Sequence, residues 1–296
     1  MRVGVIDVGA NTARLLVARV DGRGLVERVY EERAQIGLGA EIETRGKISK
    51  RKRTEVAAAV AHAVANSRAA GAQQVEVIVT SPGRQCDNAA ALEGALARAV
   101  GSSVRMLSAH EEARLAFLGA AATAADVDRV GLAVCDVGGG STQIAVGSIV
   151  GVPAWTASID LGSLRLARRC LRDDPPSGPD LRASRIAVRT ALAPLTVPPP
   201  REALATGGTA RALKKLVGAT LGPEQLEEAL SLLSARPSRE ISTRIPVPEW
   251  RTKLLPAGAV ILSEVQRLLG QPLVVARGGV REGAAIELRQ RTAAAA

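Results

Sequence analysis

The sequence has very few aromatic, histidine and cysteine residues, and each shortage argues against a class of site. Phe, Tyr and Trp together make up only 1% of the 296 residues, so the chain lacks the stacking platforms with which proteins bind single-stranded nucleic acid. The 2 His and 3 Cys are too few for a histidine metal cluster, and three scattered Cys support neither a disulfide framework nor a zinc site. We therefore expect no sequence-specific nucleic-acid partner and a reducing compartment.

Long apolar runs are also missing. The longest candidate, 116–125, is short and alanine-rich, whereas a membrane-spanning helix needs roughly 20 apolar residues. Asp7 and Asn11 interrupt the first apolar stretch, which is not typical of a signal peptide. The sequence therefore predicts a cytoplasmic protein without a membrane partner.

The residues that are abundant indicate folded hydrophobic cores and a preference for anionic partners. Hydrophobic residues make up 47% of the chain, enough to build about two domains from Leu, Val, Ile and Ala. The formal net charge of +10 favours polyanionic partners. Biased codon usage in an Arg- and Ala-rich chain would produce the same charge, so this signal alone does not identify a ligand.

The most informative stretch is 132–146, in which an apolar run ends at Asp136, passes through Gly138, Gly139 and Gly140, and returns to alternating apolar residues. This pattern predicts strand, tight turn, strand. Three glycines allow close approach to a ligand, and successive N–H groups in such a turn bind anions. Asp136 is placed to hold a hydrated divalent cation or a water. A glycine-rich hairpin without any ligand is the alternative.

The same pattern occurs twice, because 3–17 aligns with 132–146 without a gap and places Asp7 on Asp136. A second pair, 77–84 and 203–211, keeps nearly the same offset. Two agreeing registers predict an internal duplication, with domains 1–124 and 125–296. We expect the two Asp-Gly turns to face each other across a cleft and to bind a phosphate from both sides.

Local signals place several further elements. Val56, Val60 and Val64 predict a helix over 49–70 with Ser49 as its N-cap, and 37–47 is expected to be a loop. The cations at 50–53 are either a solvated helix face or a polyanion contact. Ser108 and Glu111 have the spacing of a capping box; the neighbouring Glu112 has no capping role.

With these motifs in place, the chain resembles the exopolyphosphatase and guanosine pentaphosphate phosphohydrolase (Ppx/GppA) family, in its short two-domain form. The resemblance covers nearly the whole chain and rests on 6–12, 80–88, 107–115, 136–142, 206–209 and 279–283. The most specific segment is Glu111-Glu112-Ala113-Arg114-Leu115, which other branches of the actin, Hsp70 and sugar-kinase superfamily lack. The resemblance implies an α/β fold of two duplicated ribonuclease-H-like domains around a central cleft.

The resemblance also implies roles for individual residues. Glu112 would orient or deprotonate the attacking water, and Asp136 would lie beside Mg²⁺ and that water. The residues that it implies for phosphate binding are Asn11, Arg84, Gly138, Gly139, Gly140, Ser141, Gly207, Gly208 and Thr209. Asp7 would reach the metal through a water. Two positions depart from the family pattern: Ala10 replaces a serine, and Gln143 replaces a glutamate that normally helps to hold the metal.

Three functions are compatible with this set of residues. The first is an exopolyphosphatase, or a guanosine pentaphosphate 5'-phosphohydrolase, which Glu112 and Asp136 favour. The second is a polyphosphate- or alarmone-binding protein with weak turnover, which Gln143 and Ala10 favour. The third is a kinase or chaperone of the superfamily, against which the Glu111–Leu115 segment argues. Inorganic polyphosphate or a guanosine alarmone is the predicted partner, and a homodimer is a further option.

Overall fold

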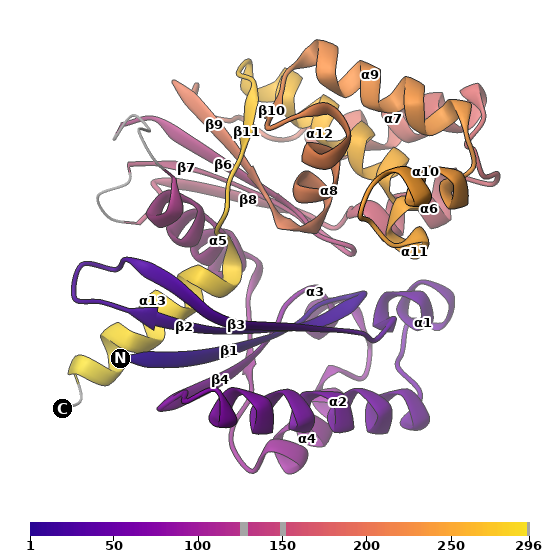
Figure 1. Cartoon of the computed structure of the whole chain (residues 1–296). Coiled ribbons are helices and arrows are strands. Elements are labelled where there is room, and N and C mark those ends of the chain that lie inside the picture. Colours follow the sequence, from indigo (N-terminus) through magenta and orange to yellow (C-terminus); the bar gives the residue numbers. More distant parts are fainter. Residues whose placement is uncertain (125–129, 149–151, 295–296) are drawn as a thin grey trace. The chain divides into compact units, whose positions relative to one another are not determined.

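The computed structural model describes residues 1–124, 130–148 and 152–294 (Figure 1), and the chain divides into two compact units. Unit 1 comprises Met1–Thr123 and Gly278–Ala296, and unit 2 comprises Ala124–Arg277. The units differ from the predicted domains in the last helix, which we had assigned to the second domain and which belongs to unit 1. Of the predicted boundary segment 124–129, all but Ala124 lies outside the described residues.

The sheet of unit 1 has the strand order β3-β2-β1-β4-β5. Its strands are β1 (Arg2–Val8), β2 (Thr12–Val20), β3 (Val26–Gln35), β4 (Gln74–Val79) and β5 (Arg105–Met106). The first three form an antiparallel meander, β4 runs parallel to β1, and β5 runs parallel to β4. The carboxyl ends of β1 and β4 therefore lie side by side.

The helices of unit 1 cover both faces of this sheet. They are α1 (Leu38–Arg45), α2 (Lys50–Ala69), α3 (Ser81–Gln85), α4 (Ala89–Val100), α5 (Ala109–Thr123) and α13 (Val280–Ala294). On one face, Val8 and Leu15 pack in a core with Val56 of α2 and Leu96 of α4. On the other face, strand residues pack against α5 and α13 in a second core (Figure 1).

Two glycines bring α5 and α13 into backbone contact. A Cβ added at Gly283 would lie 2.0 Å from the carbonyl oxygen of Leu115, and one at Gly119 would lie 2.0 Å from that of Gly279. Since no side chain separates the two helices at these points, α13 is held in unit 1 by main-chain packing. This contact is the physical reason why the last helix departs from the predicted division.

The sheet of unit 2 has the order β10-β11-β9-β6-β7-β8. Its strands are β6 (Leu132–Val137), β7 (Thr142–Gly147), β8 (Trp155–Ile159), β9 (Glu202–Thr206), β10 (Thr220–Leu221) and β11 (Leu273–Val275). The strands β8, β7, β6, β9 and β11 repeat the order and the directions of β3, β2, β1, β4 and β5 in unit 1. Strand β10 pairs antiparallel with β11 and lies at the edge of the sheet.

The predicted duplication is confirmed by the register of the paired hairpins. Asp7 lies opposite Arg14 in unit 1, and Asp136 lies opposite Gln143 in unit 2. Each turn is closed by the same main-chain bond, from Gly9 N–H to the Thr12 carbonyl and from Gly138 N–H to the Ser141 carbonyl, both 3.0 Å long. That Asp7 and Asp136 face each other across a cleft stays a prediction.

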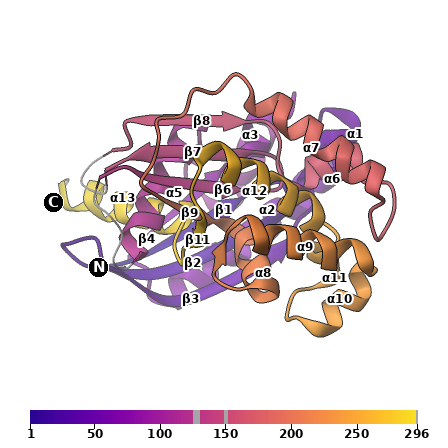
Figure 2. The same cartoon turned by 90° about the horizontal axis from the view of Figure 1, so that it is seen from above.

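The helices of unit 2 surround α12. They are α6 (Ser163–Cys170), α7 (Gly178–Leu192), α8 (Gly207–Val217), α9 (Pro223–Ala235), α10 (Ser238–Arg244), α11 (Glu249–Thr252) and α12 (Leu255–Leu269). Almost every residue of α12 is buried, and the helix contacts α6, α7, α8 and α9 (Figure 2). Within the described part of the chain, no helix combines the length and the apolar character needed to cross a membrane.

The local predictions differ in their outcome. The helix predicted over 49–70 is confirmed as α2. Ser49 is its N-cap, because the Ser49 hydroxyl accepts a hydrogen bond from the main-chain N–H of Lys52. The loop predicted over 37–47 is wrong, because Leu38–Arg45 is helical. The Asn11 and Ala10 carbonyls accept the N–H groups of Gly37 and Gly39, so α1 begins on a tertiary contact with the first Asp-Gly turn.

Candidate active site

The hairpin of unit 2 places a row of polar side chains across the sheet. Asp136 on β6 lies opposite Gln143 on β7 and beside Thr206 on β9, and Gln143 lies opposite Ser158 on β8. Directly opposed side chains share one face of a sheet, with Cβ atoms about 5 Å apart. Asp136 is only 9% exposed and Gln143 only 1%. Gln143 and Asp136 therefore share one face of the sheet.

The three-glycine turn is oriented by helix α6. The Gly138 carbonyl accepts from Ser163 N–H, and the Gly139 carbonyl accepts from Leu164 N–H, both at 2.9 Å. In a trans peptide the N–H points opposite to the C=O. The N–H groups of Gly139 and Gly140 therefore point away from α6, on the side where an anion would meet successive amide donors.

The carboxamide of Gln143 has one satisfied end and one unsatisfied end. Its Nε2 donates to the Ser141 hydroxyl at 2.8 Å and to the Ser158 hydroxyl at 3.1 Å. Its Oε1 is buried and accepts no hydrogen bond from the described residues. An unsatisfied buried acceptor costs about 1–3 kcal/mol, and this oxygen is a suitable ligand for a hard cation.

The Gly207–Gly208 turn touches two charged side chains. Gly207 has φ +89°, and a Cβ added there would lie 2.2 Å from Oδ1 of Asp136. A Cβ at Gly208 would lie 2.2 Å from Nη1 of Arg251 in α11. The Arg251 guanidinium also lies over the Trp250 ring, 4.8 Å from its centroid. Neither residue was predicted, because a four-residue helix far along the chain has no signal linking it to this turn.

Thr209 has a different environment from the other predicted phosphate contacts. A Cβ added at Gly258 of α12 would lie 2.2 Å from its Cγ2 methyl, and the Thr209 side chain is buried. The methyl group therefore packs α8 against α12. Phosphate contact by Thr209 stays a prediction.

In unit 1, Asp7 and Asn11 lie at the first Asp-Gly turn. Thr80, which follows β4, has its hydroxyl 3.4 Å from Oδ1 of Asp7. Burial raises the pKa of Asp7 above its usual value, while the positive charges of Arg14 and Arg281 act in the opposite direction. Asn11 accepts main-chain bonds from Ile36 and Gly37, which fix its backbone.

Two predicted site residues from distant segments meet in unit 1. Arg84 Nη2 donates to Oε2 of Glu112 at 2.6 Å, and Arg84 Nη1 donates to the Leu107 carbonyl at 2.9 Å. Glu112 is only 5% exposed. The arginine therefore fixes the orientation of a buried carboxylate.

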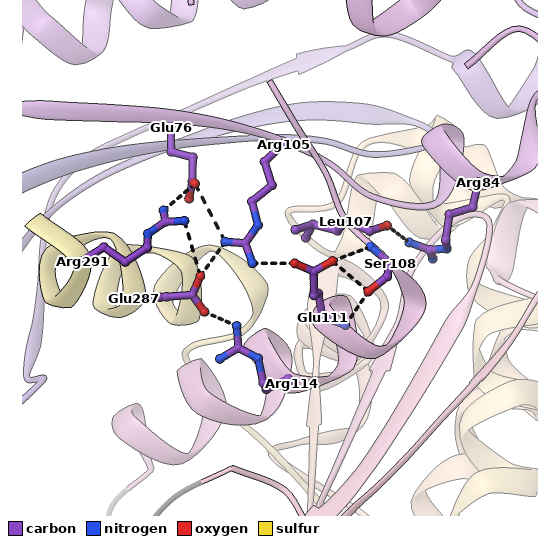
Figure 3. Close-up of polar contacts among 9 residues, drawn as sticks. All are labelled: Glu76, Arg84, Arg105, Leu107, Ser108, Glu111, Arg114, Glu287 and Arg291. Carbon is purple, nitrogen blue, oxygen red and sulfur yellow. Dashed lines mark hydrogen bonds and ion pairs between the residues drawn. The ribbon is translucent and has the colours of Figure 1, made fainter. Parts of the chain in front are cut away.

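The neighbouring Glu111 has the predicted structural role. Its main-chain N–H donates to the Ser108 hydroxyl, and its carboxylate accepts from the N–H and the hydroxyl of Ser108, which confirms the capping box (Figure 3). Burial acts to raise the pKa of Glu111, but hydrogen bonds from Arg105 and Ser108 outweigh it and lower that pKa to about 2.

Arg105 continues this contact into a network of charged side chains. Figure 3 shows ion pairs that join β4, β5, α5 and α13 through Glu76, Arg105, Glu111, Arg114, Glu287 and Arg291. Arg105 is paired to Glu287 at 2.5 Å, and Arg114 binds the other oxygen of Glu287. Arg114, a member of the family segment, therefore stabilises the α5–α13 contact.

The described residues contain no group of three or more His, Cys, Asp or Glu side chains that could hold a metal. Magnesium does not require such a group, because it commonly binds one or two carboxylates together with waters and substrate phosphates. Asp136 and the unsatisfied oxygen of Gln143, opposite each other in the hairpin, fit that mode of binding.

Comparisons with known proteins show the family and the fold of this chain. Exopolyphosphatase 2 of Mycobacterium tuberculosis is 28% identical over 321 residues, covering 97% of this chain and 98% of the relative. Exopolyphosphatase 1 of the same species is 26% identical over 300 residues, covering 96% and 87%. The crystal structure of the Aquifex aeolicus family member superposes with a TM-score of 0.83 at 24% identity, covering 99% of this chain and 98% of that chain, which shows the same fold. The model of the Ppx/GppA phosphatase family matches residues 16–292, and the chain belongs to that family.

Proposed function

We propose that this protein releases terminal phosphate from inorganic polyphosphate by metal-assisted attack of water. The observation that supports it most directly is the buried Glu112 carboxylate, which Arg84 fixes at 2.6 Å, whereas the neighbouring Glu111 pairs with Ser108 in the cap of α5. Relatives named exopolyphosphatase align over nearly the whole chain. A base, an anion-binding turn and a hard-cation ligand set are the groups that phosphoryl transfer from an anhydride requires.

In this proposal Glu112 accepts a proton from the attacking water. The water oxygen forms a bond to the terminal phosphorus, and the bond from that phosphorus to the bridging oxygen breaks. The bridging oxygen leaves on the shortened chain. Proton transfer by a positioned carboxylate contributes roughly 10²–10⁴-fold to the rate.

The residues of unit 2 bind the phosphate and the metal. The N–H groups of Gly139 and Gly140 donate to oxygens of the terminal phosphate, and Ser141 lies at the same turn. Asp136 and Oε1 of Gln143 would hold Mg²⁺. When bound, Mg²⁺ supplies positive charge that offsets the charge developing on the phosphate oxygens.

A guanosine pentaphosphate is the second candidate substrate, and one observation favours it. Arg251 lies at the Gly207–Gly208 turn with its guanidinium over the Trp250 ring, and an aromatic ring paired with a guanidinium is a surface on which a purine base can stack. Inorganic polyphosphate has no base and would gain only the charge of Arg251.

Phosphate release from both substrates in Mg²⁺ distinguishes the two candidates. We expect release from polyphosphate, and we expect Trp250→Ala to leave this activity within a few-fold of the unmodified protein. Release from guanosine pentaphosphate alone, with loss of that activity in Trp250→Ala, would replace the first candidate by the second. Release from neither substrate would contradict the proposed reaction.

A further inference from the structure

A cation-lined groove lies between α2 and α4 of unit 1, which run side by side on one face of the sheet (Figure 1). Its volume is about 370 Å³. The side chains of Lys50, Arg53 and Arg98 line it, and small residues of α4, among them Ala91, Gly94 and Ala95, form its floor. None of the lining residues is acidic or aromatic.

The four cations at the start of α2 divide into two pairs. Arg51 and Lys52 form ion pairs with Glu55, at 3.8 and 2.9 Å. Lys50 and Arg53, together with Arg98 of α4, form no ion pair with any carboxylate in the described part of the chain. Of the four cations at 50–53, the two without an acidic partner among the described residues are the ones that line the groove.

Local packing directs these cations toward the groove. A Cβ added at Gly94 would lie 3.2 Å from Nη1 of Arg98, so this guanidinium folds back along the floor. Arg53 Nη1 is held by the Ile48 carbonyl at 2.5 Å. Lys50 is the first residue of the 20-residue α2, where the helix dipole adds positive potential. Three cations that line one groove and a helix N-terminus together favour an anion.

We propose that this groove is a second anion-binding site, separate from the candidate active site, that binds an internal stretch of an inorganic polyphosphate chain. The choice of polyanion rests on the proposed function. An inorganic chain needs only cations along a path, whereas single-stranded nucleic acid is bound with aromatic stacking platforms, and the groove has none. Release of counterions from a polyanion makes such binding favourable and dependent on salt.

The test compares two variants that each lose two positive charges from the same region. Lys50→Gln/Arg98→Gln removes groove cations, and Arg51→Gln/Lys52→Gln removes cations already paired with Glu55. Arg53 is left in place because it supports the Ile48 carbonyl. Binding of long-chain polyphosphate and of tripolyphosphate is measured by titration calorimetry at several salt concentrations.

We expect the groove variant to bind long-chain polyphosphate at least tenfold more weakly than the control variant. The slope of log Kd against log salt should fall by about one to two, as expected for two lost phosphate contacts. Binding and turnover of tripolyphosphate should be the same in both variants. Equal long-chain affinities of the two variants would overturn the proposal, and so would equal competition by single-stranded RNA.

This binding measurement separates the groove from the proposed function. Weaker binding by the groove variant in a protein that hydrolyses neither substrate would contradict the proposed reaction and support the groove. Normal hydrolysis with equal binding of long-chain polyphosphate by the two variants would support the proposed reaction and contradict the groove as a binding site.

Discussion

Gln143 occupies the position in unit 2 that is best placed to change the metal affinity of the site. It lies opposite Asp136, almost fully buried, with an amide oxygen that accepts no hydrogen bond from the described residues. A glutamine supplies a ligand oxygen without the negative charge of a glutamate. The hard cation therefore loses part of its electrostatic attraction, and we expect weak magnesium binding in this protein.

Replacing Gln143 by Glu should restore that attraction. We expect the magnesium concentration for half-maximal phosphate release to fall about tenfold, since an added negative charge beside the cation is worth on the order of 1.4 kcal/mol, and we expect the rate to rise. Magnesium titrations of the unmodified protein, Gln143→Glu and Gln143→Ala provide the comparison. Superimposable curves for all three would show that Gln143 is no metal ligand.

Arg84 has two expected roles, one in protein stability and one in substrate binding. Urea denaturation measures the first, and the salt dependence of polyphosphate binding measures the second. Its ion pair with buried Glu112 means that Arg84→Ala removes a charged partner from a buried carboxylate, at a cost of about 3–5 kcal/mol in the free energy of unfolding. Adding Glu112→Gln should recover most of this loss in urea denaturation. Arg84→Ala should also weaken polyphosphate binding and flatten its salt dependence. An unchanged salt dependence would exclude Arg84 from the substrate site.

The contact between α5 and α13 depends on glycine at its centre. A Cβ at Gly283 would lie 2.0 Å from the Leu115 carbonyl oxygen, so Gly283→Ala must push the helices apart, and overpacking of this kind costs about 1–3 kcal/mol. Gly94→Ala is the matched control, because its Cβ meets only the end of the Arg98 side chain. Alanine should stabilise that helix by up to about 1 kcal/mol. Equal effects in thermal unfolding would contradict the close packing.

The cap of α5 should make the protein sensitive to acid. The pKa of Glu111 is lowered from 4.5 to about 2, so its stabilising contribution is complete above pH 4.5 and is lost as the pH falls toward 2. Glu111→Gln should have a shallower dependence of unfolding free energy on pH in this window. Its curve should converge with that of the unmodified protein at low pH. Parallel curves would show that Glu111 contributes nothing to acid sensitivity.

Elements set by local signals could be predicted, and elements set by distant contacts could not. The Ser49 cap and the Ser108–Glu111 box involve residues three apart, so the spacing itself is the signal. Helix α1 was missed because main-chain bonds to Ala10 and Asn11 support its start. The place of α13 was missed because backbone contacts such as that of Gly283 with Leu115 leave no pattern in the hydrophobic periodicity.

The duplicated architecture follows from the repeated strand-turn-strand pattern, but the two copies differ in chemistry. The residue opposite the turn aspartate is Arg14 in unit 1 and Gln143 in unit 2. The same position in the fold therefore holds a cation in one copy and an uncharged amide in the other. Asp7 thus lies opposite a fixed positive charge, whereas Asp136 lies opposite a group that can share a metal.

The candidate site was predictable to different degrees in the two units. Gly138 to Ser141 and Asp136 were indicated by the glycine turn, whereas the role of Glu112 was implied by the resemblance to the family. Arg251 was not, since only folding brings it to the Gly207–Gly208 turn. The Arg84–Glu112 pair was predicted as two separate site residues and not as an ion pair.

The measurement that tests the central claim most directly is phosphate release from polyphosphate by Glu112→Gln, with Glu111→Gln as the matched neighbour. Both variants lose one carboxylate from the same turn of α5. If Glu112 is the base, its replacement should lower the turnover number by roughly 10²–10⁴-fold without reducing polyphosphate binding, while Glu111→Gln should stay within a few-fold of the unmodified protein near neutral pH. Turnover by Glu112→Gln within a few-fold of the unmodified protein would contradict the account.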